Sequence, residues 1–223
     1  MPRISRFIVD NGTYHVFCRG HNKQKIFHDD YDFSKYLNIF AECKEKQNLK
    51  LHHYVLMPNH PHLIIKTITG FDLSNAMRTL NQTYAQYYRA KYGGAGYVWQ
   101  DRFKSFVIQD GLYLLECGRY IELNPVRAGI VLAPENYKWS SYRFYAFGEK
   151  NNLIDANPEY IGLSDNPAMR MKKYIEFVKD GFKEKRKLLR YFREGGYGNE
   201  NFVEKLRENG LKQVKWQKGR PSK

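Results

Sequence analysis

"LKLHHYVLMPNHPHLIIKT", residues 49–67, contains two apolar runs separated by a proline and an asparagine. The first run, residues 49–57, is typical of a strand, and residues 62–67 are typical of a second strand. Pro58 and Asn59 are residue types that favour a tight turn. The stretch therefore predicts a β-hairpin in the interior of the chain.

The hairpin lies between two segments with helical periodicity. Residues 29–47 open with aspartates that can cap a helix, and residues 72–94 run from Asp72 to a pair of glycines. Residues 13–19 and 104–110 are rich in aromatic and β-branched side chains and predict two further strands. The order strand, helix, strand, strand, helix, strand predicts an α+β, ferredoxin-like fold, an antiparallel sheet with helices on one face.

Beyond the fourth strand the sequence predicts another helix, from Gly111 to Asn124, which ends before Pro125. Residues 151–160 are polar and rich in turn formers, as a linker would be. We therefore expect a first domain over residues 1–150 and a basic, mainly helical, DNA-binding extension over residues 151–223.

Charge is the strongest signal in the composition. The 223 residues include 37 Lys and Arg against 23 Asp and Glu, a net charge of +14. Residues 181–223 alone carry 13 Lys and Arg against 5 Asp and Glu, a net +8. Such an excess favours a polyanionic partner, most often nucleic acid.

Other classes of protein are disfavoured. No run approaches the roughly 18 apolar residues of a membrane span, and the N-terminus lacks the apolar core of a signal peptide. The three cysteines form no CxxC pair, so neither a zinc site nor a disulfide framework is indicated. We expect a cytoplasmic protein with reduced thiols and no membrane partner.

His60 and His62 are two residues apart in the predicted hairpin. Side chains at i and i+2 of a strand point to the same face, so both imidazoles would project together. Two converging imidazoles suit a divalent metal. Such a pair also occurs by chance on half-exposed strands, so by itself it leaves both interpretations open.

Tyr120 and Asn124 are four residues apart in a predicted helix and share one face of it. Alone, they are equally compatible with an ordinary helix that ends before a proline. Together with the histidine pair and the net charge they indicate phosphoryl chemistry. A metal held by two imidazoles and an amide oxygen keeps open positions for phosphate oxygens, and a phenol beside it can attack phosphorus.

With these residues in place, the sequence resembles the single-tyrosine HUH transposases, above all their REP-associated tyrosine transposase branch. Six segments between about residues 13 and 145 carry the resemblance, in the order of that family: "YHVFCRG", "KIFHDDYDF", "VLMPNHPHLII", "VWQDRFKS", "RYIELNPVRAGIV" and "YKWSSYRFY". Pro61 departs from the bulky residue usual between the two histidines, although proline is tolerated at a strand start.

The resemblance implies a metal-dependent endonuclease and strand transferase that acts on single-stranded DNA beside hairpins, in a nucleoid-associated setting. It implies that His60, His62 and Asn124 bind Mg²⁺ or Mn²⁺, of which imidazole ligands favour Mn²⁺. It also implies that Tyr120 is the nucleophile and forms a 5′-phosphotyrosine. The sequence leaves a monomer and a homodimer equally open.

Five cations are candidate phosphate contacts, with solvated surface cations as the alternative: Arg19, Arg78, Arg102, Lys104 and Arg127. Trp99, after a glycine-rich loop, can either stack on a base or belong to the core. Two rival functions remain, a catalytically inactive hairpin-binding protein and an RNA-binding ferredoxin-like module. The second lacks the aromatic-rich strand motif of RNA-binding modules.

Overall fold

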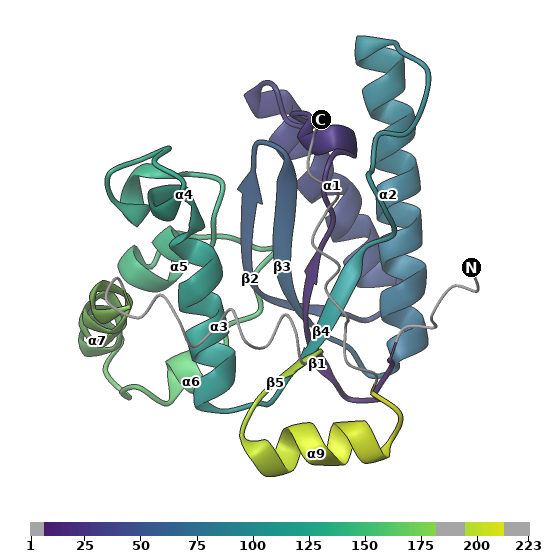
Figure 1. Cartoon of the computed structure of the whole chain (residues 1–223). Helices are drawn as coiled ribbons and strands as arrows, with labels where there is room; N and C mark the ends of the chain where they lie inside the picture. The colour runs from purple at the N-terminus through teal and green to yellow at the C-terminus, as the bar shows by residue number, and fades with distance from the viewer. Residues whose placement is uncertain (1–6, 182–194, 212–223) are drawn as a thin grey trace, which may run out of the picture.

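The computed structural model describes residues 7–181 and 195–211 (Figure 1). The strands are β1 (Thr13–Phe17), β2 (Lys50–Met57), β3 (His60–Lys66), β4 (Lys104–Ile108) and β5 (Gly196–Tyr197). The α-helices are α1 (Asp30–Lys46), α2 (Gly70–Tyr92), α3 (Leu112–Glu122), α4 (Asn124–Arg127), α5 (Tyr142–Phe147), α6 (Pro158–Ile161), α7 (Pro167–Asp180) and α9 (Glu200–Glu208). Two 3₁₀ turns are η1 (His21–Lys23) and η2 (Pro134–Asn136).

The sheet has the strand order β2-β3-β1-β4-β5. Its first four strands pair antiparallel, which confirms the predicted hairpin and the ferredoxin-like α+β order. A fifth strand that was not predicted, β5, pairs parallel with β4. A strand of two residues, Gly196 and Tyr197, carries no alternation by which its sequence could reveal it.

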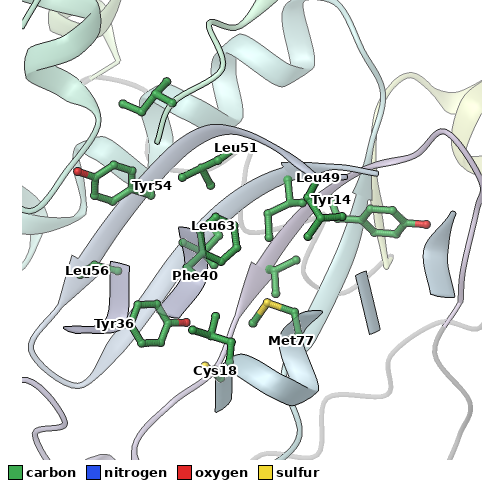
Figure 2. Packing of buried hydrophobic residues seen from close by; sticks show 14 of the residues in the cluster. Tyr14, Cys18, Tyr36, Phe40, Leu49, Leu51, Tyr54, Leu56, Leu63 and Met77 are labelled. Atoms are coloured by element: carbon green, nitrogen blue, oxygen red, sulfur yellow. The ribbon is translucent and has the colours of Figure 1, made fainter. Parts of the chain in front are cut away.

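Helices α1 and α2 cover one face of the sheet. Asp29 and Asp32 form a capping box that starts α1, and the Thr69 side chain caps α2. The apolar stripes of both helices pack on the strand residues that point toward them, and Figure 2 shows this layer around Phe40, Leu63 and Met77. This layer is the larger part of the core.

The other face of the sheet is covered by α3, so the prediction of helices on one face was wrong. In Figure 1 the sheet lies between α1 and α2 on one side and α3 on the other. Val55, Ile64 and Phe106 form an apolar cluster there with Cys117 and Ile121 of α3. Because both faces of the sheet are covered, consecutive residues of β2 and β3 are buried, as at residues 54–57 and 63–65.

The described part of the C-terminal segment packs against the first 150 residues. Tyr160 of α6 and Tyr174 of α7 are buried in the same core as the α1–α2 layer. The mainly helical character predicted for residues 151–223 agrees with α6, α7 and α9, while the domain boundary at residue 150 stays a prediction. Residues 182–194 and 212–223 of the basic segment lie outside the described residues.

None of the described helices is long and apolar enough to cross a membrane.

Candidate active site

His60 and His62 lie on β3 and point to the face that α3 covers. Their ring centroids are 4.8 Å apart, which confirms the predicted common face. His62 is buried, and His60 is partly exposed at the strand start. The strand geometry thus places two imidazoles side by side, and their role as metal ligands stays a prediction.

Each of the two rings uses Nδ1 for its hydrogen bond. Nδ1 of His60 lies 2.5 Å from Oδ1 of Asn59, and Nδ1 of His62 lies 2.7 Å from Nε2 of His15. Because the Asn59 oxygen can only accept, Nδ1 of His60 is the donor, and Nε2 keeps its lone pair. The contact between His62 and His15 joins two ring nitrogens, one of which donates and the other accepts according to the tautomer.

Burial keeps these imidazoles neutral. It lowers the pKa of His15 to about 3 and that of His60 to about 4, and lowers the pKa of His62 well below its usual value. The positive charge of Arg19 further lowers the pKa of His60 and His62. A neutral ring with a paired Nδ1 atom and an unprotonated Nε2 atom, as at His60, is the form in which histidine binds a metal.

Pro61, between the two histidines, fits its position in β3. It is paired with Leu56 of β2, whose backbone N–H donates to the Trp139 carbonyl instead of to β3. On its other side β1 has already ended, since the last pair is Phe17 with His62. No strand therefore requires the N–H that proline lacks, and the departure from the usual residue leaves both imidazoles in place.

Tyr120 lies on α3 and packs against the apolar cluster on the same face of the sheet. The guanidinium of Arg127 is 5.1 Å from the centre of its ring and also donates to the Tyr120 carbonyl. Burial raises the pKa of the Tyr120 phenol, and the Arg127 charge opposes that rise. The phenol is therefore protonated at neutral pH, with a cation in position to stabilise its anion.

A buried polar network fixes α3 against β2. Glu122 accepts from Ser141, from Tyr174 and, at 2.9 Å, from Nδ1 of His53, and neither side chain of the His53–Glu122 pair is exposed. The second ring nitrogen of His53 contacts the Asn157 amide at 2.9 Å. The network lies two residues beyond Tyr120 and holds that turn of the helix in place.

Asn124 is the first residue of α4, because the predicted single helix divides in two after Glu122. The residue between them, Leu123, keeps helical dihedral angles of φ −83° and ψ −6°. The chain therefore holds its helical course, and Asn124 follows Tyr120 by about one turn. Its role as a ligand stays a prediction.

Across residues 7–181 and 195–211, no three His, Cys, Asp or Glu side chains form a group that could hold a metal ion. A metal bound by His60 and His62 would therefore need a ligand of another type. An amide oxygen such as that of Asn124 is a suitable one, because carbonyl oxygens and imidazoles together suit Mn²⁺.

The structure brings some of the candidate phosphate-binding cations to this face and not others. Lys104 and His62 flank Phe17 in neighbouring strands, so all three point to the α3 side. Arg19 follows β1 at the same end, Arg102 is exposed just before β4, and Arg127 contacts Tyr120. Arg78 is exposed on α2, across the sheet, where it bonds to Asn75.

Sequence reasoning missed His15 and Glu122, two residues that support the site. His15 is fully buried beside His62, and Glu122 with His53 anchors α3. The sequence held a signal for the first, because all seven histidines lie within residues 15–62. Trp99 belongs to the core, where it packs near Tyr36 and Tyr84 and donates to the Asn81 carbonyl.

Comparisons with known proteins concern the family and the fold of this chain. A family model described as "Transposase IS200 like" matches residues 8–124, more than half of the chain. A REP-associated tyrosine transposase bound to a REP hairpin has a similar fold, with a TM-score of 0.56 and 20% identity over 70% of this chain and 94% of the other. A putative transposase from Deinococcus radiodurans gives a TM-score of 0.38 and 14% identity over 61% and 95% of the two chains. No curated protein sequence matches.

Proposed function

Because this chain belongs to the IS200-like transposase family, we propose that it is a metal-dependent endonuclease and strand transferase for single-stranded DNA, of the REP-associated tyrosine transposase type. The observation that carries the proposal is the pair of neutral imidazoles on β3, which project to the same side of the sheet as the helix that bears Tyr120. An inert hairpin-binding protein would not need this combination.

In the proposed reaction Tyr120 is the nucleophile. Its phenol oxygen forms a bond to phosphorus, and the bond from phosphorus to the 3′ oxygen breaks. The phenol loses its proton, and the departing 3′ oxygen takes one up to become a free hydroxyl. The product is a 5′-phosphotyrosine, which keeps the phosphodiester energy for transfer to another hydroxyl.

The chain's own residues would prepare that step. Arg127 stabilises the phenolate of Tyr120, and Arg19 and Lys104 attract the DNA backbone to the same end of the sheet. His60, His62 and Asn124 would hold Mn²⁺ or Mg²⁺, which supplies Lewis-acid polarisation of the phosphate. The fit is supported by the Nε2 lone pair of His60, which the Asn59 contact leaves available, and by the contact of His62 with His15, which uses Nδ1 of His62 and not Nε2.

The substrate proposed is a DNA hairpin with an unpaired flank. The net charge of +14 suits the phosphate backbone. The solved REP-associated transposase of similar fold is described as bound to a REP hairpin. The proposal is compatible with a monomer and with a homodimer. Sedimentation of the protein–DNA complex would distinguish the two.

Trapping the covalent intermediate tests the proposal. The full chain is incubated with Mn²⁺ and a panel of hairpin oligonucleotides that carry single-stranded flanks, and denaturing gels are examined for protein–DNA adducts. We expect an adduct that peptide mass spectrometry maps to Tyr120 among the 18 tyrosines. Tyr120→Phe, His60→Ala and His62→Ala should each abolish it and leave hairpin affinity within a few-fold, because phosphate contacts supply most of the affinity.

Two outcomes would contradict the proposal. An adduct on another tyrosine would refute the nucleophile. Hairpin binding by the wild-type chain with no adduct on any oligonucleotide, in Mn²⁺ or Mg²⁺, would instead support the inactive hairpin-binding alternative.

A further inference from the structure

Tyr97 is the most exposed aromatic side chain among the described residues, at 77%. It lies in the loop between α2 and β4, two residues before the core residue Trp99. Single exposed tyrosines are common on protein surfaces. Tyr97 differs in how its backbone is held and in what lies next to it.

The backbone that carries Tyr97 is held on its C-terminal side by a short antiparallel contact with the segment after β1. Trp99 pairs with Gly20 across an isolated bridge. The His21 N–H donates to the Val98 carbonyl and the Gln100 N–H to the Arg19 carbonyl, both at 2.8 Å. The ring is therefore presented from a fixed position, and fixing it costs little entropy when a ligand binds.

The loop before Tyr97 turns outward on glycines. Gly93, Gly94 and Gly96 have φ values of 69°, 90° and 106°, and none would bring an added Cβ within 4 Å of another atom. Arg89 donates to the Gly96 carbonyl and ties this part of the loop to the last turns of α2. The loop is open to solvent and still anchored at both of its ends.

The same contacts connect Tyr97 to the proposed active site. The Gly20 N–H donates to the Asn59 carbonyl at 2.9 Å, and the Asn59 side chain accepts from His60. The imidazole of His21 lies beside Tyr97, with ring centroids 6.4 Å apart and planes tilted by 50°. The two exposed rings therefore lie next to the strand end that bears His60.

The surface around the two rings is cationic. The segments 18–27 and 93–104, which hold the rings, contain one acidic residue, Asp101. The exposed cations of these segments are Arg19, Lys23, Lys25, Arg102 and Lys104. Sequence-tolerant binding of single-stranded nucleic acid uses exposed aromatic rings among cations.

We propose that Tyr97 and His21 form a platform on which an unpaired base of the DNA substrate stacks, next to the cleavage site. The surrounding cations hold the phosphates on either side of that base. The proposal depends on the proposed function for the identity of the substrate and adds the place where its single-stranded flank lies.

Binding measurements on two oligonucleotides test the platform. One is the hairpin with its single-stranded flank, and the other is the same hairpin without the flank. Tyr97→Ala should bind the flanked hairpin roughly 5- to 100-fold more weakly than wild type does, because it loses one base–aromatic stack. Tyr97→Phe, which keeps the ring, should stay within about threefold of wild type, and all variants should bind the bare hairpin alike.

Phe71→Ala is the matched control, since Phe71 is 69% exposed at the opposite end of α2. It should bind both oligonucleotides as wild type does. An abasic site scanned along the flank should find one position at which wild type loses affinity and Tyr97→Ala does not. That position locates the stacked base.

Equal binding of the flanked hairpin by Tyr97→Ala and wild type would overturn the platform. An equal loss on the bare hairpin would overturn it as well, because the loop would then contact the duplex. Neither result depends on adduct formation. The two proposals can therefore fail separately. If wild type forms the Tyr120 adduct but Tyr97→Ala binds the flanked hairpin normally, only the platform is wrong. If Tyr97→Ala loses affinity but wild type forms no adduct, only the proposed function is wrong.

Discussion

His15 is a buried residue in contact with His62, one of the proposed metal ligands. Its Nε2 lies 2.7 Å from Nδ1 of His62, and it is fully buried. When His15 accepts the Nδ1 proton, it fixes both the tautomer and the ring orientation of His62. Partners of this kind typically change metal affinity by about 10- to 100-fold.

We therefore predict that His15→Ala weakens Mn²⁺ binding by about 10- to 100-fold. His15→Gln keeps an acceptor and should lose less. Titration of the DNA-free protein, followed by the electron paramagnetic resonance of free Mn²⁺, measures the affinity directly. His28→Ala is the control, because His28 is exposed and bonds to Tyr88. Unchanged Mn²⁺ affinity in a folded His15→Ala protein would contradict the assignment.

Arg127 supports a second residue-scale prediction. Its charge lowers the pKa of the Tyr120 phenol, while burial raises it. Arg127→Gln should therefore raise that pKa and move the rise of adduct formation to higher pH. Cation–π contacts of this kind contribute about 1 kcal/mol, so we expect a rate about fivefold to tenfold lower at pH 7.5. Single-turnover rates across pH measure it, and an unshifted profile would exclude Arg127 from this role.

At the scale of elements, the position of α3 decides where Tyr120 lies. Gly118 of α3 faces His53, and an added Cβ would lie 2.6 Å from two atoms of that ring. The ring cannot retreat, because it stacks on Tyr145 and both of its nitrogens have partners. The helix therefore approaches β2 more closely than any larger residue would allow.

We predict that Gly118→Ala moves α3 away from β2 and slows adduct formation at saturating DNA by at least about tenfold, since misplacement by about 1 Å can cost 100-fold. Overpacking should also destabilise the fold by about 1–3 kcal/mol. Gly162→Ala is the matched control, because its Cβ would meet atoms only at 3.6 Å. A normal rate in Gly118→Ala would show that the close approach is unnecessary.

The contact between α1 and α2 depends on one buried carboxylate. Burial opposes the charge of Asp32, but hydrogen bonds from Lys91, Tyr87 and the His28 backbone outweigh it and lower the pKa to about 2. An unfolded aspartate has a pKa near 3.9. The stability that this carboxylate contributes is therefore present above about pH 4 and is lost as the pH falls toward 2.

Asp32→Asn should cost about 2 kcal/mol at pH 7, which lowers the melting temperature by about 5 °C. The difference in stability from wild type should shrink between about pH 4 and pH 2, because wild type then loses the carboxylate contribution that the variant already lacks. Melting curves at several pH values measure both effects. A constant difference over that range would mean that the carboxylate charge contributes nothing.

At the scale of the whole molecule, the net charge of +14 is concentrated toward the C-terminus. Deletion from residue 181 would also remove β5 from the edge of β4. Truncation after Leu211 avoids this, since residues 212–223 carry five Lys and Arg and no acid. We predict that the basic segment of residues 181–223 clamps the hairpin backbone, and its last residues, 212–223, lie outside the described part of the chain.

We predict that this truncation makes the dependence of log affinity on log salt shallower by roughly 3 to 4 units, since each duplex phosphate contact contributes about 0.9. Affinity should fall similarly for all hairpin sequences, because phosphate contacts position and do not specify. Adduct formation at saturating DNA should persist. An unchanged salt dependence would exclude the clamp.

The sequence by itself determined the order of the first four strands and the helices between them. Strand alternation, helical periodicity and caps such as Asp29 are local, so neighbouring residues specify them without the rest of the fold. The sequence also determined that His60 and His62 share a face of the sheet, because the alternation of side chains along a strand is local as well. The helix that carries Tyr120 was predicted to within two residues at each end.

Only the tertiary structure decided which distant segments meet. The register of β1 against β3 brings His15 to His62, 47 residues away. The polar network of Glu122 and His53 selects the face of the sheet on which α3 lies, and β5 joins the sheet from residue 196 onward. These contacts gain their energy from burial and pairing, which exist only once the chain has folded, so no local pattern in the sequence records them.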